Sequence, residues 1–194
     1  HLILNYNMCS STLRNFKWVG VLLVLLFPGM LLARFNVSIL DRKAGLSGNS
    51  ITSIIQDQLG FIWIGTKYGL NRYDGTSIKV FDSDNSILSS SDISDLLLGL
   101  DGFIYVATTQ GTFYKYLFES ESFHDLGIHI PWVKEQGQIS SVFQARSGRI
   151  FLATSDGVME YKNGTFNLIE LAHEGVNYKV RAKDVYEDTQ GRIW

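Results

Sequence analysis

Four segments of this chain repeat one pattern of glycine and aromatic residues at a nearly constant spacing. The anchor glycines, separated by 42, 46 and 43 residues, are Gly60, Gly102, Gly148 and Gly191. Three positions after them stand the aromatic residues Trp63, Tyr105, Phe151 and Trp194. A second glycine closes the first three units, at Gly69, Gly111 and Gly157. Because a unit of this length cannot bury its apolar faces alone, the pattern predicts a fold in which similar units stack.

The first unit shows what each repeat is expected to form. Short apolar segments alternate there with turn residues, and we expect four strands, in ITSIIQD, FIWIGT, LNRYD and IKVFD. A tight hairpin over residues 57–60 would join the first two strands, with glycine where the backbone needs a positive φ. Short strands joined by short turns form one antiparallel sheet per repeat.

A four-stranded repeat of about 40–50 residues is typical of a β-propeller blade, whereas the repeats of a parallel solenoid, the alternative, are nearer 20–30 residues. We therefore predict an all-β fold, an incomplete β-propeller of four-stranded antiparallel blades. The expected blades are at about 46–88, 89–134 and 135–178, with a truncated one at 179–194. The aromatic residue of each second strand would wedge between neighbouring blades, so the repeated glycines and aromatics are interpreted as structural.

The N-terminal segment has a different character. Arg14 and Lys17 precede an uncharged apolar run from Trp18 to Ala33. A basic region followed by an apolar region is typical of a secretory signal peptide or a signal anchor. We therefore predict such a hydrophobic helix at 1–35 and the partial propeller at 36–194. The chain is expected to be an N-terminal fragment of a longer protein, because an incomplete ring of blades cannot close.

The composition and the motifs of the sequence argue against several classes of function. The formal charge of −2 gives no argument for nucleic-acid binding. Cys9 is the only cysteine, so a disulfide framework and a thiolate metal site are not expected. The familiar catalytic and phosphate-binding motifs are missing from the sequence. We assign no catalytic residue, metal ligand or cofactor to this chain.

Several polar residues have simple structural interpretations. The spacing of His124 and His129 places them on opposite faces of a strand, which does not favour a metal site. The segment DSDNS at 82–86 is similar to a calcium loop, but Ile87 stands where such a loop needs glycine. We interpret it as a polar connection between blades. Glu119 and Glu121 are interpreted as a solvated edge.

The segment GLSGNSITSIIQDQLGFIWIGTKYGLNRYDG, residues 45–75, resembles the two-component regulator propeller repeat. The positions that match that pattern are Asn49, Ser50, Gly60, Trp63, Gly65, Thr66, Gly69, Leu70, Asn71, Arg72, Tyr73 and Asp74. The second and third repeats depart from it, with Tyr105 and Phe151 in place of tryptophan and Ala107 and Ala153 in place of glycine.

The resemblance implies a sensor. Propellers of this kind resemble the periplasmic or extracytoplasmic halves of membrane histidine kinases, including Bacteroidetes hybrid kinases that often sense glycan fragments. It implies a small-molecule or oligosaccharide ligand, a homodimer in the full-length protein and attachment to the inner membrane by the N-terminal segment or a downstream helix. The alternatives are a protein-binding scaffold propeller without signalling output and a carbohydrate-active propeller enzyme.

Candidate ligand-binding residues follow from the predicted fold. In a propeller, the turns between second and third strands share one face with the connections between blades. The exposed residues expected at those turns are Lys67, Tyr68, Gln110 and Asp156. Polar and aromatic side chains there could hold a sugar through hydrogen bonds and ring stacking.

Overall fold

The computed structural model describes residues 38–127, 138–169, 171–173, 176–178 and 180–194. The predicted hydrophobic helix at 1–35 lies outside the described residues. Within those residues, no helix has both the length and the hydropathy of a membrane span. A short 3-10 helix, η1 (Arg42–Ala44), precedes the first strand.

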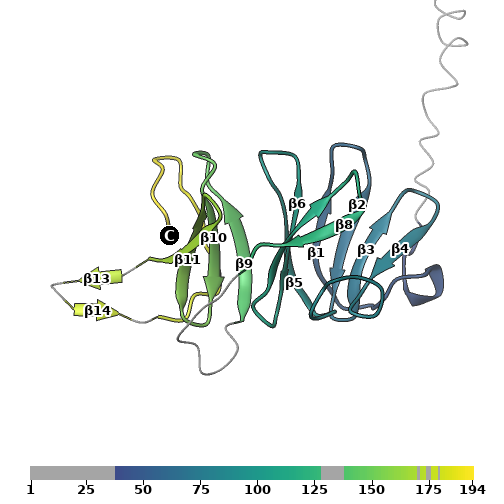
Figure 1. Cartoon of the computed structure of the whole chain (residues 1–194), viewed down its shortest axis with the longest axis horizontal. Coiled ribbons are helices and arrows are strands. Elements are labelled where there is room, and N and C mark those ends of the chain that lie inside the picture. The colour runs from purple at the N-terminus through teal and green to yellow at the C-terminus, as the bar shows by residue number, and fades with distance from the viewer. Residues whose placement is uncertain (1–37, 128–137, 170, 174–175, 179) are drawn as a thin grey trace, which may run out of the picture. The chain divides into compact units, whose positions relative to one another are not determined.

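Three four-stranded antiparallel sheets follow one another along the described part of the chain (Figure 1). The first blade contains β1 (Ile51–Gln56), β2 (Ile62–Thr66), β3 (Gly69–Tyr73) and β4 (Ile78–Phe81). The second contains β5 (Ile93–Leu98), β6 (Ile104–Thr108), β7 (Phe113–Leu117) and β8 (Ser122–Asp125). The third contains β9 (Ile139–Gln144), β10 (Ile150–Thr154), β11 (Gly157–Lys162) and β12 (Thr165–Leu168). Neighbours in sequence are neighbours in each sheet, which is the predicted meander.

A further hairpin was not predicted from the sequence. It is formed by β13 (Leu171–His173) and β14 (Val176–Tyr178), which pair only with each other among the described residues. The fourth repeat follows, and its two ends pair through the backbones of Tyr186 and Trp194. This pairing is an isolated bridge between Glu187 and Ile193, and the fourth blade itself stays a prediction.

The hairpin glycines adopt the backbone conformation that the sequence pattern predicts. Gly60 has a φ of +92°, and its N–H donates to the carbonyl of Asp57 at 3.2 Å. Residues with a Cβ rarely adopt such a φ, which explains why glycine stands at this turn. The equivalent glycines Gly102, Gly148 and Gly191 have φ values of +80°, +85° and +80°.

The aromatic residues of the second strands lie between blades, as predicted. Trp63 is fully buried, and its ring centroid is 4.7 Å from that of Tyr116 in the second blade. Tyr105 packs in the same way into the core shared by the second and third blades, and Phe151 packs against Val185 of the fourth repeat. The core of the molecule is therefore a series of interfaces between blades.

Small residues two positions after these aromatics allow the blades to approach. A Cβ placed on Gly65 would lie 2.9 Å from the Ile93 side chain of the second blade. That separation is shorter than real carbon contacts, so the glycine is required by close packing. Ala107 and Ala153, at the equivalent positions, are also fully buried.

Each aromatic residue of the repeat that has a polar hydrogen has a carboxylate acceptor in its own hairpin. The Trp63 indole donates to Asp57 at 2.8 Å, and the Trp194 indole donates to Asp188 at 3.0 Å. This bond is the largest of the causes that lower the pKa of Asp188 to about 2. The third repeat has the apolar Phe151, and Ala145 occupies the position of the acceptor.

In the second repeat, a carboxylate at a different position accepts the hydrogen bond from the aromatic residue. Gly99 stands where the first and fourth hairpins have the acceptor, and Asp101 accepts from the Tyr105 hydroxyl at 2.9 Å. A Cβ on Gly99 would lie 2.4 Å from the Asp101 carboxylate, so the glycine makes room for it. The position of the carboxylate acceptor and the identity of the aromatic residue therefore change together from blade to blade.

Candidate functional site

The residues predicted to bind a ligand all lie in the turns between second and third strands. They are Lys67, Tyr68, Gln110 and Asp156. Buried threonines order two of these turns: the N–H of Tyr68 donates to Thr66 Oγ1 at 3.0 Å, and that of Asp156 donates to Thr154 Oγ1 at 3.2 Å. Lys67, Tyr68 and Gln110 are exposed, and Asp156 is half-buried.

These turns share one end of the blades with the connections between blades. The N–H of Thr109 donates to the carbonyl of Asp92 at 3.0 Å, and that of Ser155 donates to the carbonyl of Gln138 at 3.1 Å. The four candidate residues come from three successive blades. A ligand that touched all of them would extend across two blade interfaces.

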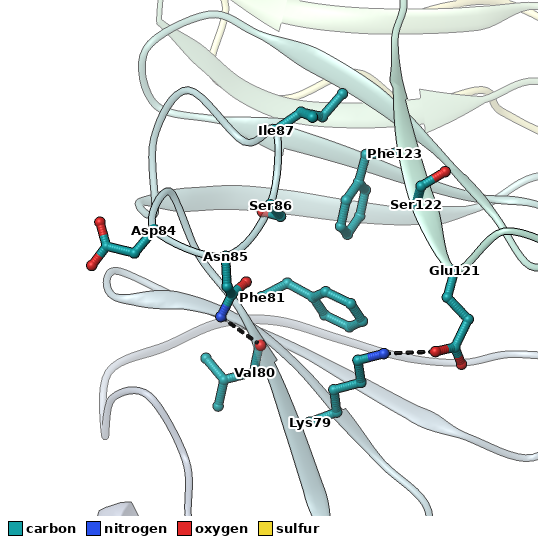
Figure 2. A pocket seen from close by; sticks show the side chains of 10 residues that line it. All are labelled: Lys79, Val80, Phe81, Asp84, Asn85, Ser86, Ile87, Glu121, Ser122 and Phe123. Atoms are coloured by element: carbon teal, nitrogen blue, oxygen red, sulfur yellow. Dashed lines mark hydrogen bonds and ion pairs between the residues drawn. The ribbon is translucent and has the colours of Figure 1, made fainter.

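A groove that the sequence analysis missed lies between the outer strands of the first two blades (Figure 2). Its volume of about 640 Å³ is in the range of small-molecule sites. The lining residues are Lys79, Val80, Phe81, Asp84, Asn85, Ser86, Ile87, Glu121, Ser122 and Phe123. In Figure 2, Ile87 and Phe123 lie at one end, and the pair formed by Lys79 and Glu121 lies at the other.

Packing and hydrogen bonds fix the walls of this groove. Phe81 and Phe123 are almost fully buried and contact each other edge to face, with ring centroids 5.3 Å apart. The Asn85 amide donates to the carbonyl of Val80 at 3.1 Å, and its oxygen accepts from the N–H of Asp82 at 3.1 Å. This side chain occupies part of the free edge of β4, which would otherwise be open to pairing with another strand.

Glu121 joins the two blades at the polar end of the groove. Its Oε2 lies 2.6 Å from Lys79 Nζ, and its Oε1 lies 2.8 Å from Arg72 Nη2, both from the first blade. Hydrogen bonds from Lys79 and Arg72, in that order, lower the pKa of Glu121 to about 2. Glu121 is exposed, as predicted for a solvated edge residue, but the sequence analysis missed its pairing with two cations of the first blade.

The backbone of Glu121 is also unusual. Its φ of +47° is in the left-handed region, which glycine or asparagine adopts most readily. The equivalent hairpin of the first blade has glycine, Gly75, with a φ of +97°. We infer that the two ion pairs hold a residue in a conformation that its own preference does not favour.

The pairing of Glu121 predicts a pH-dependent stability. Its pKa in the folded protein, about 2, is below the ordinary value of 4.5, so its contribution is present above pH 4.5 and is lost as the pH falls towards 2. We expect Glu121→Gln to lower the melting temperature at neutral pH, because Arg72 and Lys79 lose their counter-charge. The difference from the wild type should shrink with acidification, as measured by calorimetry from pH 7 to pH 2.

Glu119→Gln is the matched control, because Glu119 is exposed and lies in the same turn. This variant should melt like the wild type across the pH range. An equal effect of both substitutions would show that general charge, and not the contact between blades, is responsible.

The groove has the chemistry of a binding site. Lys79 Nζ carries three N–H donors, of which Glu121 uses one, and the Ser122 hydroxyl lines the same wall. The phenyl rings and Ile87 provide apolar contact. Within the described residues, no cluster of three or more histidine, cysteine, aspartate or glutamate side chains could hold a metal ion.

The first repeat is similar in sequence to known proteins. Residues 45–68 match the family described as two component regulator propeller. A stretch of 37 residues is 46% identical to histidine kinase P4 of Formosa agariphila, which is 19% of this chain and 3% of that protein. The chain therefore spans only a small part of that relative.

Solved structures share the fold at low sequence identity. The extracellular domain of a hybrid two component system from B. thetaiotaomicron has a TM-score of 0.62 and 18% identity, over 81% of this chain and 28% of that one. Virginiamycin B lyase of Staphylococcus aureus has a TM-score of 0.55 and 10% identity, over 75% of this chain and 48% of that one. At these identities the likeness shows the propeller fold alone.

Proposed function

This chain carries the two-component regulator propeller repeat, and from that premise we propose that it forms part of the ligand-sensing region of a sensor histidine kinase. The observation that carries the proposal is the family match at residues 45–68. The identity of 46% with a histidine kinase over 37 residues supports it. We propose that the sensing region lies on the extracytoplasmic side of the inner membrane. The domain of a hybrid two component system that shares its fold is described as extracellular, which supports the extracytoplasmic part of this proposal.

A ligand can bias a kinase only if it binds one conformation more tightly than another. We propose the groove between β4 and β8 as such a site, because its two walls belong to different blades. A ligand in the groove would contact both blades, and its affinity would depend on their separation. We place the ligand there, with the turn residues Lys67 and Tyr68 as a second candidate surface.

The ligand is proposed to be a small molecule or an oligosaccharide. Lys79 and Glu121 compensate each other at the rim, and the remaining charged side chain of the lining, Asp84, gives the groove no attraction for an anion. Hydroxyl groups could accept from Lys79 and exchange hydrogen bonds with Ser122, while carbon faces contact Ile87. The full-length protein is proposed to act as a homodimer, in which binding changes the packing of the subunits.

A topology experiment tests the cellular placement. Alkaline phosphatase, which is active only outside the cytoplasm, is fused after Trp194 and expressed in a Gram-negative host. We expect activity from the whole chain and none after deletion of residues 1–35. Activity that does not depend on this segment, or no activity in either case, would refute the extracytoplasmic placement.

Filling the groove tests the ligand site. We expect Ser122→Trp to abolish the thermal stabilisation that neutral oligosaccharides give to the wild type, because the indole would occupy the cavity. Saturation at a hundred times Kd corresponds to about 2.7 kcal/mol. Ser140→Trp is the matched control, since Ser140 is an exposed serine of β9 that does not line the groove. Stabilisation that survives Ser122→Trp would locate the ligand elsewhere.

A further inference from the structure

A second cavity lies between the second and third blades, at the end of the sheets opposite to the turn that contains Lys67 and Tyr68. Its volume of about 370 Å³ is in the range of small-molecule sites. The side chains that decide its chemistry come from both blades and are Asp101, Tyr105, Arg149, Tyr161, Lys162 and Asn163. The groove between β4 and β8 belongs to the first interface, so this cavity is a separate site.

The equivalent place in the first interface is filled by protein side chains. Arg72 Nη1 lies 3.0 Å from the Tyr116 hydroxyl, and Arg72 Nη2 lies 2.8 Å from Glu121. The register of the strands makes Lys115 the equivalent of Arg72 and Tyr161 the equivalent of Tyr116. A contact between Lys115 and Tyr161 would therefore repeat the first interface in the second.

Lys115 does not make that contact. Its Nζ lies 2.9 Å from Asp101 Oδ2 and 3.7 Å from the centre of the Phe103 ring, both in its own blade. The Tyr161 hydroxyl consequently has no hydrogen-bond partner among the described residues. Burial, and after it the negative charge of Asp101, raises the pKa of Tyr161, so this hydroxyl keeps its proton and can donate it to a ligand.

The outer hairpin of the third blade is also shorter than that of the second. In the second blade, a loop of four residues, 118–121, carries Glu121 to the first blade. In the third blade, the loop consists of Asn163 and Gly164 alone. It brings no carboxylate over the second interface, so the space that Arg72 and Glu121 fill in the first interface stays open here.

Hydrogen bonds hold the walls of the cavity in place. Gln144 Oε1 accepts from the N–H of Leu100 at 2.7 Å across the interface, and the Gln144 amide donates to the carbonyl of Gly148 at 2.9 Å. The Tyr105 hydroxyl donates to Asp101 at 2.9 Å. The cavity is therefore shaped before a ligand enters, which keeps the entropic cost of binding low.

The charges around the cavity leave one cation without a partner. Asp101 pairs with Lys115, and Arg149 pairs with Glu160 at 2.6 Å. Lys162 is exposed and forms no ion pair within the part of the chain that the structure describes. The donors available to a ligand are the Lys162 ammonium and the Tyr161 hydroxyl, a combination that suits an anionic oxygen group.

From this arrangement we propose that the cavity binds a small carboxylate that also carries hydroxyl groups. The carboxylate accepts from Lys162 and Tyr161. The hydroxyl groups donate to Asp101 Oδ1, whose one donor in the described structure is the N–H of Phe103 at 3.3 Å, and they exchange hydrogen bonds with the Asn163 amide. The proposal does not use the sensor role, so either can fail without the other.

Calorimetric titration of the 194-residue chain with D-glucuronate tests the site. We expect Lys162→Gln and Tyr161→Phe each to weaken binding about tenfold, because each removes one hydrogen bond to the carboxylate. Lys162 is exposed and Tyr161→Phe keeps the ring, so both variants should fold. Lys183→Gln is the matched control, since Lys183 is an exposed lysine that does not line the cavity, and it should bind like the wild type.

Two further probes separate the charge from the hydroxyl groups. Glucose lacks the carboxylate and acetate lacks the hydroxyl groups, so both should bind more weakly than glucuronate. The Ser122→Trp variant should bind glucuronate like the wild type, because the indole fills the groove of the other interface. No binding of glucuronate at millimolar concentration, equal binding of glucose or acetate, or an equal loss in Lys183→Gln would overturn the proposal.

Discussion

Replacement of Trp63 by alanine is expected to lower the free energy of unfolding by about 3–5 kcal/mol. The side chain is fully buried and lies between two blades, with ring centroids 4.7 Å from Tyr116 and 5.9 Å from Phe81. Removal leaves a cavity that faces two separate sheets, neither of which can collapse into it without moving its blade. Urea denaturation followed by circular dichroism measures the effect.

The control for this prediction is Tyr68→Ala. Tyr68 is an aromatic residue of the same blade, but it is 64% exposed. Its removal should change the stability by no more than about 0.5 kcal/mol. If both variants unfolded at the same urea concentration, Trp63 would not be the wedge that holds the first two blades together.

Asp57→Ala is expected to have the second largest effect, about 2–4 kcal/mol, because it leaves several donors without an acceptor. The Asp57 carboxylate, in a residue only 5% exposed, accepts from the N–H groups of Leu59 and Phe61, each at 2.9 Å, and from the Trp63 indole at 2.8 Å. The loss therefore affects both the hairpin and the wedge. Denaturant unfolding gives the magnitude.

A double-mutant cycle separates these two parts. Trp63→Phe removes the indole donor, as in the third repeat, where Phe151 and Ala145 are both apolar. We expect the combination Asp57→Ala with Trp63→Phe to be about 1–2 kcal/mol more stable than the sum of the single effects. Strict additivity would show that the indole bond contributes nothing, and the loss would then belong to the hairpin alone.

The hairpins and strands could be predicted from the sequence because their causes are local. Gly60 needs a positive φ whatever surrounds it, and Trp63 follows at a fixed distance along the same strand. Because these local signals repeat along the chain, the four-stranded blade could be predicted as well. The position of Tyr68 in a turn could be predicted from the same repeated pattern.

The groove and its ion pairs could not be found in this way. Arg72 and Glu121 are 49 residues apart, and nothing in the sequence near either one indicates the other. The exchange of acceptor between Asp57 and Asp101 was missed for a related reason. It becomes visible only when the room beside Gly99 is known.

Local signals in the sequence were enough to define the repeating unit: a four-stranded sheet with glycine at its hairpin and an aromatic ring on its second strand. They were enough because backbone strain and strand alternation act within a few residues. The side-chain contacts between units, such as those of Glu121 with Lys79 and Arg72, could be identified only in the folded molecule. Those contacts depend on the distance and rotation between neighbouring sheets, which are set by the summed packing of both blades and not by any local pattern.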